Sequence, residues 1–275
     1  MTYTYPFYIP SIYRPNSEFL IKIRDFQLKY YIIIASHQYD SYNQQFPKEN
    51  LVILPDNIIK ISEIRQYIIE LAIKNNESRI WMSDDDLSKF FIKDVKDVKD
   101  VKTDGNKLTE LDFKTFIERS EEIIKKISIL DTSIVQFGFK YSTFAIPKNK
   151  FSINTNIGMI QLLDVSRIKE KVSYDYNFPA LEDTDFTIQL FNNGFNNCCL
   201  NHFIITAPKS GGKSKKNKGG LELEYQNGAK QKGILAFQNK YPKLIKIIDL
   251  EKGKYTILWN TFDKTVLPLL LTKAV

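Results

Sequence analysis

The sequence predicts an α/β fold in which helices flank a mostly parallel central sheet. The continuous apolar run from Tyr30 to Ala35 is typical of a parallel strand buried on both faces. Strand-like and helix-like segments alternate through the first half of the chain, which favours parallel strands joined by right-handed crossovers. With 275 residues, of which 43% are hydrophobic, the chain is long enough to bury one large core.

In the first half, short apolar runs predict strands, and apolar residues repeating every three or four positions predict helices. Phe113, Phe116, Ile117 and Ile124 show the helical spacing most clearly. In chain order we expect a strand that starts near Tyr5 and is broken by Pro15, a helix over 19–28, strands over 30–35 and 51–55, a helix over 62–74, a strand over 80–84 and a helix over 112–130.

The second half predicts strands over 133–141, 156–164 and 198–206, a helix ending at Asn193-Gly194, a helix over 229–241, and strands over 245–250 and 256–259. We expect residues 1–205 to form the main domain. The Asp-Val-Lys repeat within it has no apolar face, so a mobile surface loop is expected at about 93–107. Residues 206–275 are expected to form a Gly/Lys-rich flexible loop and a small C-terminal annex packed on the same domain.

An apolar run that begins at Arg79 ends in three consecutive carboxylates, Asp84, Asp85 and Asp86. A strand ending there delivers its polar tip to the carboxyl edge of the sheet, where open α/β sheets bind ligands. Three adjacent carboxylates repel one another unless a cation lies among them, which favours an Mg²⁺ or Mn²⁺ site. The alternative is a solvated turn with an acidic helix cap, and these residues alone support both interpretations equally.

Two arginines lie where a phosphate-bearing ligand would need them. Arg14 ends the first strand, and a guanidinium there can contact phosphate in a bidentate manner. Arg65 lies early in the second helix, close to its positive end, which suggests a nearby anion. Either residue can equally be an ordinary surface arginine.

Further candidates lie in the second half of the chain. Glu182 and Asp183 precede a helix, where acidic residues, or Asp183 and Thr184 as caps, are also expected on structural grounds alone. A single histidine such as His202 is more often a core or surface residue than a ligand. Lys213 lies in a Gly/Lys tract that matches a relaxed phosphate-loop pattern. A nucleotide-hydrolase loop is rejected because no helix follows it, but the tract can close over a diphosphate.

The formal charge of +7 and the pI near 9.1 allow a polyanionic partner without demonstrating one, because AT-rich coding also enriches lysine. The only cysteines, Cys198 and Cys199, are adjacent, which fits a reducing compartment. No apolar run approaches the roughly 20 residues of a membrane span, and no secretory signal is recognisable. We therefore expect a cytoplasmic protein, or one in the host cytoplasm if the source is viral.

The ordered set Ile-Pro-Ser-Ile-Tyr-Arg-Pro at 9–15, Arg65, Asp84-Asp-Asp86, Leu181-Glu-Asp183 and His202 resembles the GT-A class of nucleotide-sugar glycosyltransferases. More narrowly, it is similar to the phage and eukaryotic glycosyltransferases associated with base-oxidising dioxygenases, of base-J and TET type, which glycosylate hydroxymethylated pyrimidines in DNA. The resemblance covers most of residues 6–205 in motif order. It implies that the main domain is a GT-A-like catalytic domain.

The resemblance also assigns roles to the candidate residues. It implies that Asp183 is the catalytic base and that the cofactor is Mn²⁺ or Mg²⁺, held by Asp84, Asp86 and the late ligand His202. The residues expected to hold the nucleotide-sugar are Ser11, Arg14, Arg65, Asp84, Asp85, Glu182 and Lys213.

The expected activity is transfer of a sugar, with inversion, from a UDP-type donor to a hydroxyl acceptor, preferably a 5-hydroxymethylpyrimidine in DNA. Three alternatives stay open. The acceptor can be a protein or a glycan. The cluster from Asp84 to Asp86 can serve a metal-dependent nucleotidyltransferase or nuclease. Finally, the acidic turns can be mere helix caps in a non-catalytic binding module.

Overall fold

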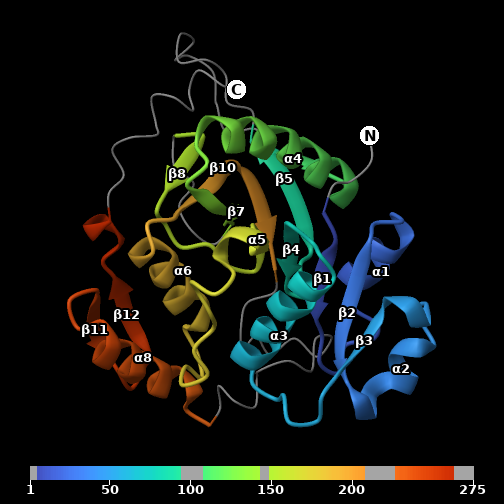
Figure 1. Cartoon of the computed structure of the whole chain (residues 1–275), viewed down its shortest axis with the longest axis horizontal. Helices are drawn as coiled ribbons and strands as arrows, with labels where there is room; N and C mark the ends of the chain where they lie inside the picture. The colour runs from blue at the N-terminus through green and yellow to red at the C-terminus, as the bar shows by residue number, and fades with distance from the viewer. Residues whose placement is uncertain (1–4, 94–107, 143–148, 208–226, 263–275) are drawn as a thin grey trace.

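The computed structural model describes residues 5–93, 108–142, 149–207 and 227–262, and a large central sheet runs through them (Figure 1). Its order is β3-β2-β1-β4-β9-β7-β10-β5-β6, and β8 pairs with β10. The strands are β1 (Phe7–Pro10), β2 (Tyr30–Ala35), β3 (Leu51–Leu54), β4 (Ile80–Ser83), β5 (Lys89–Lys93), β6 (Leu108–Leu111), β7 (Ile134–Tyr141), β8 (Phe151–Ile153), β9 (Ile160–Leu163) and β10 (Asn196–Thr206).

Parallel pairing dominates the half of the sheet that carries the acidic motif. Strands β3, β2, β1 and β4 are all parallel neighbours, and β10 runs parallel to β7. Strand β9 is antiparallel to β4 and β7, and β5 is antiparallel to β10 and β6. The predicted α/β class with a mostly parallel central sheet is confirmed.

Helices cover both faces of the sheet because successive strand residues point to opposite sides. In β2, Ile32 and Ile34 pack in one core with residues of α1 (Glu18–Asp25), α2 (Tyr39–Asn43) and α4 (Phe113–Leu130). Ile33 between them packs in the opposite core, with residues of α3 (Ile61–Lys74), α5 (Val165–Ile168) and α6 (Glu182–Asn192). This burial on both faces explains why the 30–35 run is apolar throughout.

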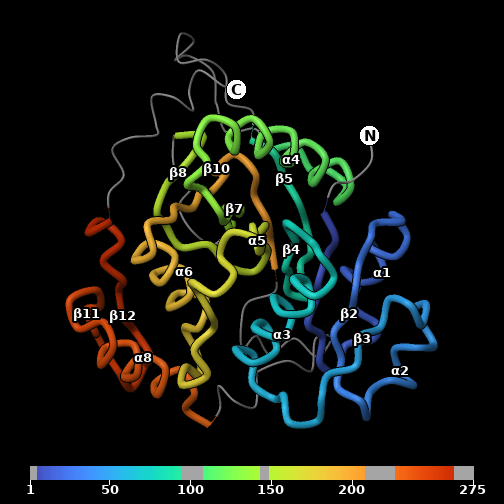
Figure 2. The backbone as a smooth tube through the Cα atoms, in the orientation of Figure 1, coloured from blue at the N-terminus to red at the C-terminus, as the bar shows by residue number. Residues whose placement is uncertain are grey.

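Residues 227–262 form an annex that packs on α6, at the red end of the chain trace in Figure 2. The annex contains α8 (Ala229–Lys240) and a hairpin of β11 (Ile245–Asp249) and β12 (Lys254–Ile257). Phe237 and Ile245 share a small core with Phe178 and Ile188. Helix α8 approaches closely at Gly233, where an added Cβ would lie 2.5 Å from the Ala180 carbonyl oxygen.

Most predicted elements are found, with small shifts at their ends. The strand expected over 156–164 is limited to β9, because Met159 adopts a left-handed φ of 61° just before it. Strands β5, β6 and β8 were not predicted, since they are short and β6 is largely exposed. The expected loop from 93 to 107 lies, apart from Lys93, outside the described residues. None of the helices in the described ranges is long and apolar enough to cross a membrane.

Candidate active site

The strand order places a switch point of the sheet at the carboxyl ends of β1 and β4. The chain leaves β1 to build β2 and β3 on one side and returns through α3 to place β4 on the other side. Open α/β sheets bind ligands at such a switch point, outside the carboxyl ends of the strands. Residues 11–17 follow β1 and residues 84–86 follow β4, so the sheet itself brings these two candidate segments together.

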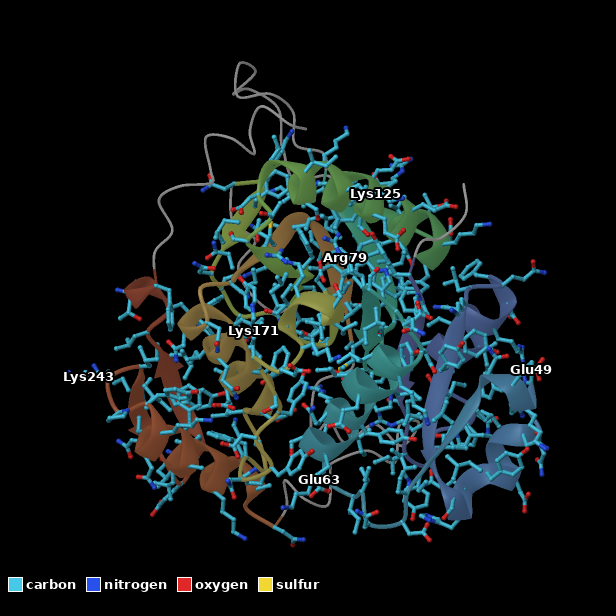
Figure 3. All side chains as sticks on the ribbon, in the orientation of Figure 1. Glu49, Glu63, Arg79, Lys125, Lys171 and Lys243 are labelled. Atoms are coloured by element: carbon cyan, nitrogen blue, oxygen red, sulfur yellow. The ribbon has the colours of Figure 1, made fainter. Side chains whose placement is uncertain are left out.

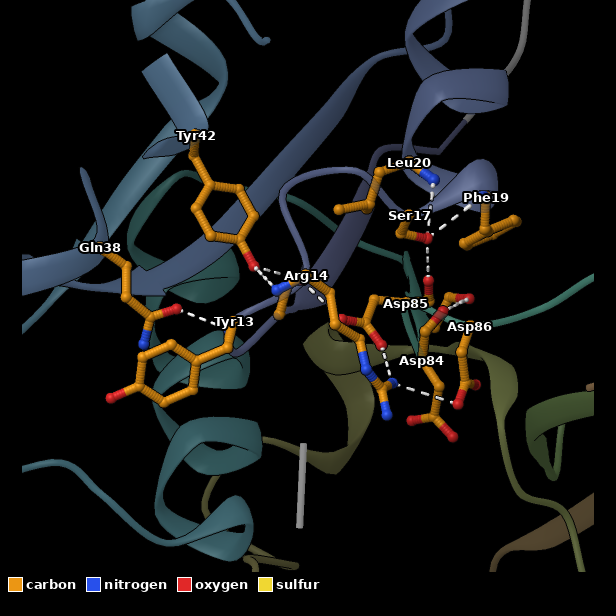
Figure 4. A network of polar contacts seen from close by, with 12 residues as sticks. Tyr13, Arg14, Ser17, Phe19, Leu20, Gln38, Tyr42, Asp84, Asp85 and Asp86 are labelled. Carbon is orange, nitrogen blue, oxygen red and sulfur yellow. Dashed lines mark hydrogen bonds and ion pairs between the residues drawn. The ribbon is translucent and has the colours of Figure 1, made fainter. Parts of the chain in front are cut away.

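Asp85 is buried and forms hydrogen bonds with the segment that follows β1 (Figure 4). Its Oδ1 accepts a hydrogen bond from an Arg14 guanidinium nitrogen at 2.6 Å, and its Oδ2 accepts one from Ser11 Oγ at 2.6 Å. The Ser17 hydroxyl also donates to the Asp85 carbonyl. Burial raises the pKa of Asp85, and the Arg14 charge opposes that rise. The structure thus uses Ser11 and Asp85 to fix the loops after β1 and β4 to each other.

Arg14 reaches beyond Asp85 to the next carboxylate. The same guanidinium nitrogen lies 3.1 Å from Asp86 Oδ2, a contact that Figure 4 marks with a dashed line. The backbone N–H of Arg14 donates to the Tyr42 hydroxyl at 3.0 Å, which holds the arginine in place from the side of α2. Burial alone would lower the pKa of Arg14, but the charges of Asp85 and Asp86 raise it overall, so this side chain stays cationic.

Arg65 joins the acidic motif to the start of α6. One of its guanidinium nitrogens lies 3.2 Å from Asp84 Oδ1, and the other lies 2.8 Å from Glu182 Oε1. Burial raises the pKa of Asp84 to about 6, partly offset by Arg65 and reinforced by neighbouring carboxylates. Burial likewise raises the pKa of Glu182, against the opposing charge of Arg65. One arginine therefore holds two carboxylates that are far apart in the sequence.

Asp183 lies in the same group of charges. Its carboxylate is among the charges that raise the pKa of Asp84 and of Glu182. Its Oδ1 accepts from the Thr184 N–H at 2.7 Å, and its Oδ2 lies 3.3 Å from the point where a Cβ on Gly158 would be. The residue after Gly158 accepts the N–H of Asp84 through its carbonyl. The absence of a side chain at Gly158 thus keeps space around this carboxylate.

The expected capping role of Asp183 or Thr184 is wrong. Helix α6 begins at Glu182, and the capping position is occupied by Leu181, whose φ of 68° is left-handed and whose side chain makes no capping hydrogen bond. Asp183 therefore lies in the first turn, near the positive end of the helix, rather than at its cap. Purely structural capping does not explain this carboxylate.

The negative charge of the site exceeds its positive charge. Asp84, Asp85, Asp86, Glu182 and Asp183 face two guanidinium groups, those of Arg14 and Arg65. The Asp84 and Asp86 side chains remain 34% and 25% exposed, so their oxygens are accessible. An excess of accessible carboxylate oxygens fits a hard divalent cation such as Mg²⁺ or Mn²⁺. Within the described ranges, however, no three His, Cys, Asp or Glu side chains are already grouped as a metal site.

The structure does not bring His202 to the carboxylates. Its Nδ1–H donates to the Lys150 carbonyl at 3.2 Å, and its ring packs edge-on against Phe151 and Phe203. His202 lies in an irregular stretch of β10, since Leu200 and Ile204 on either side of it face the consecutive residues Phe139 and Lys140 of β7. The expected metal ligand is thus a buried core residue. Lys213 lies outside the described residues.

Sequence reasoning missed an aromatic group beside Arg14. Tyr13 is 61% exposed and adopts a left-handed φ of 57°. Its hydroxyl lies 3.0 Å from His37 Nε2, and its N–H donates to Gln38 Oε1 at 2.7 Å. The position of this aromatic residue between Ser11 and Arg14 could have marked Tyr13 as a candidate site residue in the sequence. Tyr42, whose hydroxyl lies 2.7 Å from Ser11 Oγ, gave none, because only the folded chain brings it to β1.

The burial of His202 makes a prediction about stability. Burial lowers the pKa of His202 to about 4, whereas an unfolded histidine has its ordinary value of about 6.5. Acid therefore protonates the unfolded chain first, and stability falls as the pH drops below about 6.5. Between pH 7.5 and 5.0, the free energy of unfolding should fall by about 2 kcal/mol more in the wild type than in His202→Gln.

Urea unfolding at the two pH values measures this difference. Identical pH dependence in His202→Gln and the wild type would contradict the buried, neutral imidazole.

Comparisons with known proteins identify the family of the chain. The model of the TET-associated glycosyltransferase family matches residues 5–219, which is well over half of the chain. A search of curated proteins gave no significant match. Similar solved structures include residues 1–349 of TarS from S. aureus (10% identity, TM-score 0.46, 91% of this chain and 68% of that one) and a putative nucleotide-diphospho-sugar transferase from Desulfovibrio desulfuricans G20 (6%, 0.42, 86% and 97%). TM-scores below 0.5 support no inference, so the assignment rests on the family model. The chain belongs to the TET-associated glycosyltransferase family and is a glycosyltransferase.

Proposed function

We propose that the protein transfers a sugar from a UDP-type donor to the hydroxymethyl group of a modified pyrimidine in DNA, with a divalent metal ion as cofactor. The observation that carries the proposal is the convergence of Asp84, Asp86 and Asp183 around Arg14 and Arg65 at the switch point of the sheet. This arrangement supplies the groups that such a reaction needs: cations for a diphosphate, oxygens for a metal ion and a carboxylate for a proton.

The donor is proposed to lie across the carboxyl ends of β1 and β4. Arg14 and Arg65 would face its diphosphate, since a guanidinium matches phosphate oxygens in charge and geometry. Asp86 and Asp84 would hold the metal ion, which when bound neutralises charge on the departing diphosphate. The exposed ring of Tyr13, the residue before Arg14, can stack on the nucleobase of the donor.

Asp183 is proposed to be the base. Its carboxylate would take the proton of the acceptor hydroxyl, whose oxygen then attacks the anomeric carbon. As that C–O bond forms, the bond to the diphosphate breaks and the diphosphate leaves with the electron pair, which inverts the configuration. The space beside Asp183 Oδ2 at Gly158 suits a small hydroxyl group.

The acceptor is inferred from the family. The family is described by its association with TET, and the resemblance seen in the sequence implies a hydroxymethylated pyrimidine, the product of base oxidation, as the acceptor. A DNA acceptor also suits the net charge of +7. The donor sugar is left open, because no described contact distinguishes one sugar from another.

The metal assignment predicts the behaviour of Asp86→Ala. The variant should lose both donor hydrolysis and sugar transfer, because the metal ion would then lose one of its two proposed carboxylate ligands and would no longer neutralise the diphosphate. The measurement is Mn²⁺-dependent release of UDP from a UDP-sugar, with and without hydroxymethylcytosine DNA. Asp40→Ala, at an exposed position of α2, is the control and should behave as the wild type. Full metal-dependent activity in Asp86→Ala would remove Asp86 from the site, and release of pyrophosphate from nucleoside triphosphates would indicate a nucleotidyltransferase instead.

The base assignment predicts a different result for Asp183→Asn. Binding of Mn²⁺ and UDP, measured by calorimetry, should match the wild type, since Asp183 is not among the proposed diphosphate or metal ligands. Transfer at saturating substrates should fall by about 10²- to 10⁴-fold, the usual contribution of a general base. A transfer rate close to that of the wild type would show that another group takes the proton.

A further inference from the structure

The positive charge of this protein is concentrated at its C-terminal end. Residues 227–262, the annex, contain seven lysines against only Asp249 and Glu251, a net charge of +5. Residues 1–207 together carry a net charge of −2. A lysine-rich coding bias acts on the whole chain, so it does not explain why the main domain is slightly acidic and the annex strongly basic.

The annex lysines lie on its exposed surface. In the β11–β12 hairpin, Lys246 and Lys254 are exposed, while Ile245, Ile247 and Ile257 of the same strands turn inward to the annex core. Lys246 is the direct cross-strand partner of Thr256 on the exposed side of the hairpin, which also carries the 62% exposed side chain of Ile248.

Two more lysines lie near the two ends of the hairpin, Lys230 beside the turn and Lys243 just before β11. The stem of Lys230 lies against Gly253, with its Cδ 3.0 Å from the position of an added Cβ, which places it between Lys252 and Lys254 in space. Lys243, in the connection between α8 and β11, is exposed at the outer edge of the molecule in Figure 3. Exposed lysines of the annex thus lie on its helix, on its hairpin and in the connection between them.

Most of these charges are not neutralised by the protein. Among the described residues, ion pairs engage Lys240, with Asp175 and Asp185, and Lys252, with Asp249. No carboxylate within the described ranges pairs with Lys230, Lys232, Lys243, Lys246 or Lys254. An uncompensated row of lysines attracts a polyanion, and the attraction depends on salt.

The basic surface borders the proposed site. A cavity of about 280 Å³ is lined by Lys232 of the annex and by Lys60, which immediately precedes the helix that carries Arg65. Phe178 and Pro179, on the segment that leads to Asp183, form another wall of this cavity. On the inner side of the hairpin, the charges of Asp183 and Glu182 add to burial in raising the pKa of Tyr255 to about 12. The annex therefore lies next to the carboxylate that would receive the acceptor.

We propose that the exposed lysines of the annex, Lys230, Lys232, Lys243, Lys246 and Lys254, bind the phosphate backbone of the DNA acceptor and present a base to Asp183. The inference rests on the proposed function and adds to it the surface that holds the acceptor. Most of this surface lies beyond residue 219, where the family match ends. Backbone contacts of this kind position a duplex without reading its sequence.

The test compares two double variants with the same change of charge. Lys246→Gln/Lys254→Gln alters the annex, and Lys125→Gln/Lys126→Gln alters exposed positions of α4, which packs on the opposite face of the sheet. Binding of a hydroxymethylcytosine duplex is measured by fluorescence anisotropy over a range of salt concentrations. Each lost phosphate contact should reduce the slope of log K against log salt by about 0.9, so the annex variant should lose about 2.

The annex variant should also bind the duplex about 10- to 50-fold more weakly at 0.1 M salt, and its KM for DNA should rise by a similar factor. Its kcat at saturating DNA, its hydrolysis of UDP-sugar and its transfer to free hydroxymethyl-deoxycytidine should be unchanged. The α4 variant should match the wild type in every assay. Thermal unfolding of both variants checks that the fold is intact.

Two outcomes would overturn the inference. The first leaves the proposed function valid, and the second also excludes its DNA acceptor. If the wild type glycosylates DNA and the two variants bind DNA equally well, the annex is not the docking surface, but the proposed function survives. If the wild type hydrolyses UDP-sugar yet neither binds nor glycosylates DNA, the DNA acceptor itself is wrong and the docking surface falls with it.

Discussion

The site depends on two arginines that hold carboxylates together. Arg14 fixes Asp85 and reaches Asp86, while Arg65 joins Asp84 to Glu182. Without these cations, the partly buried carboxylates of residues 84–86, 182 and 183 would repel one another. Removing one partner from a buried ion pair leaves an uncompensated charge and typically costs about 3–5 kcal/mol. The two arginines thus allow the acidic cluster to exist, and they leave an excess of negative charge that a metal ion can balance.

The sheet makes this arrangement possible. Because β1 and β4 are parallel neighbours, the segments that follow them emerge at the same edge and their polar side chains meet. Helix α3 then brings Arg65 to that edge, and α6 brings Glu182 and Asp183 from the second half of the chain. The annex packs on α6 through Phe178, Ile188 and the close approach at Gly233, so the same helix holds both the proposed acceptor surface and Asp183, the proposed base.

Much of this could be predicted from the sequence, because its signals are local. The apolar run at 30–35, the helical spacing in 113–130 and the acidic end of β4 each reflect a single element and its burial. The link between Arg65 and the acidic motif was also within reach, since a cation near a helix start suggests an anion. What failed depends on contacts between distant segments. His202 is held by the Lys150 carbonyl and by Phe151 and Phe203, and no pattern around residue 202 reveals that environment. The same holds for Tyr42, which meets Ser11 only after folding.

The central claim is that a divalent ion and a nucleoside diphosphate bind at the carboxyl ends of β1 and β4. Anomalous diffraction at the manganese edge, from crystals grown with Mn²⁺ and UDP, tests it most directly. The account predicts one strong peak within coordination distance of a carboxylate oxygen of Asp86, with the diphosphate between that peak and the guanidinium groups of Arg14 and Arg65. An ion and a nucleotide bound elsewhere on the molecule, with neither in contact with Asp86, Arg14 or Arg65, would contradict it.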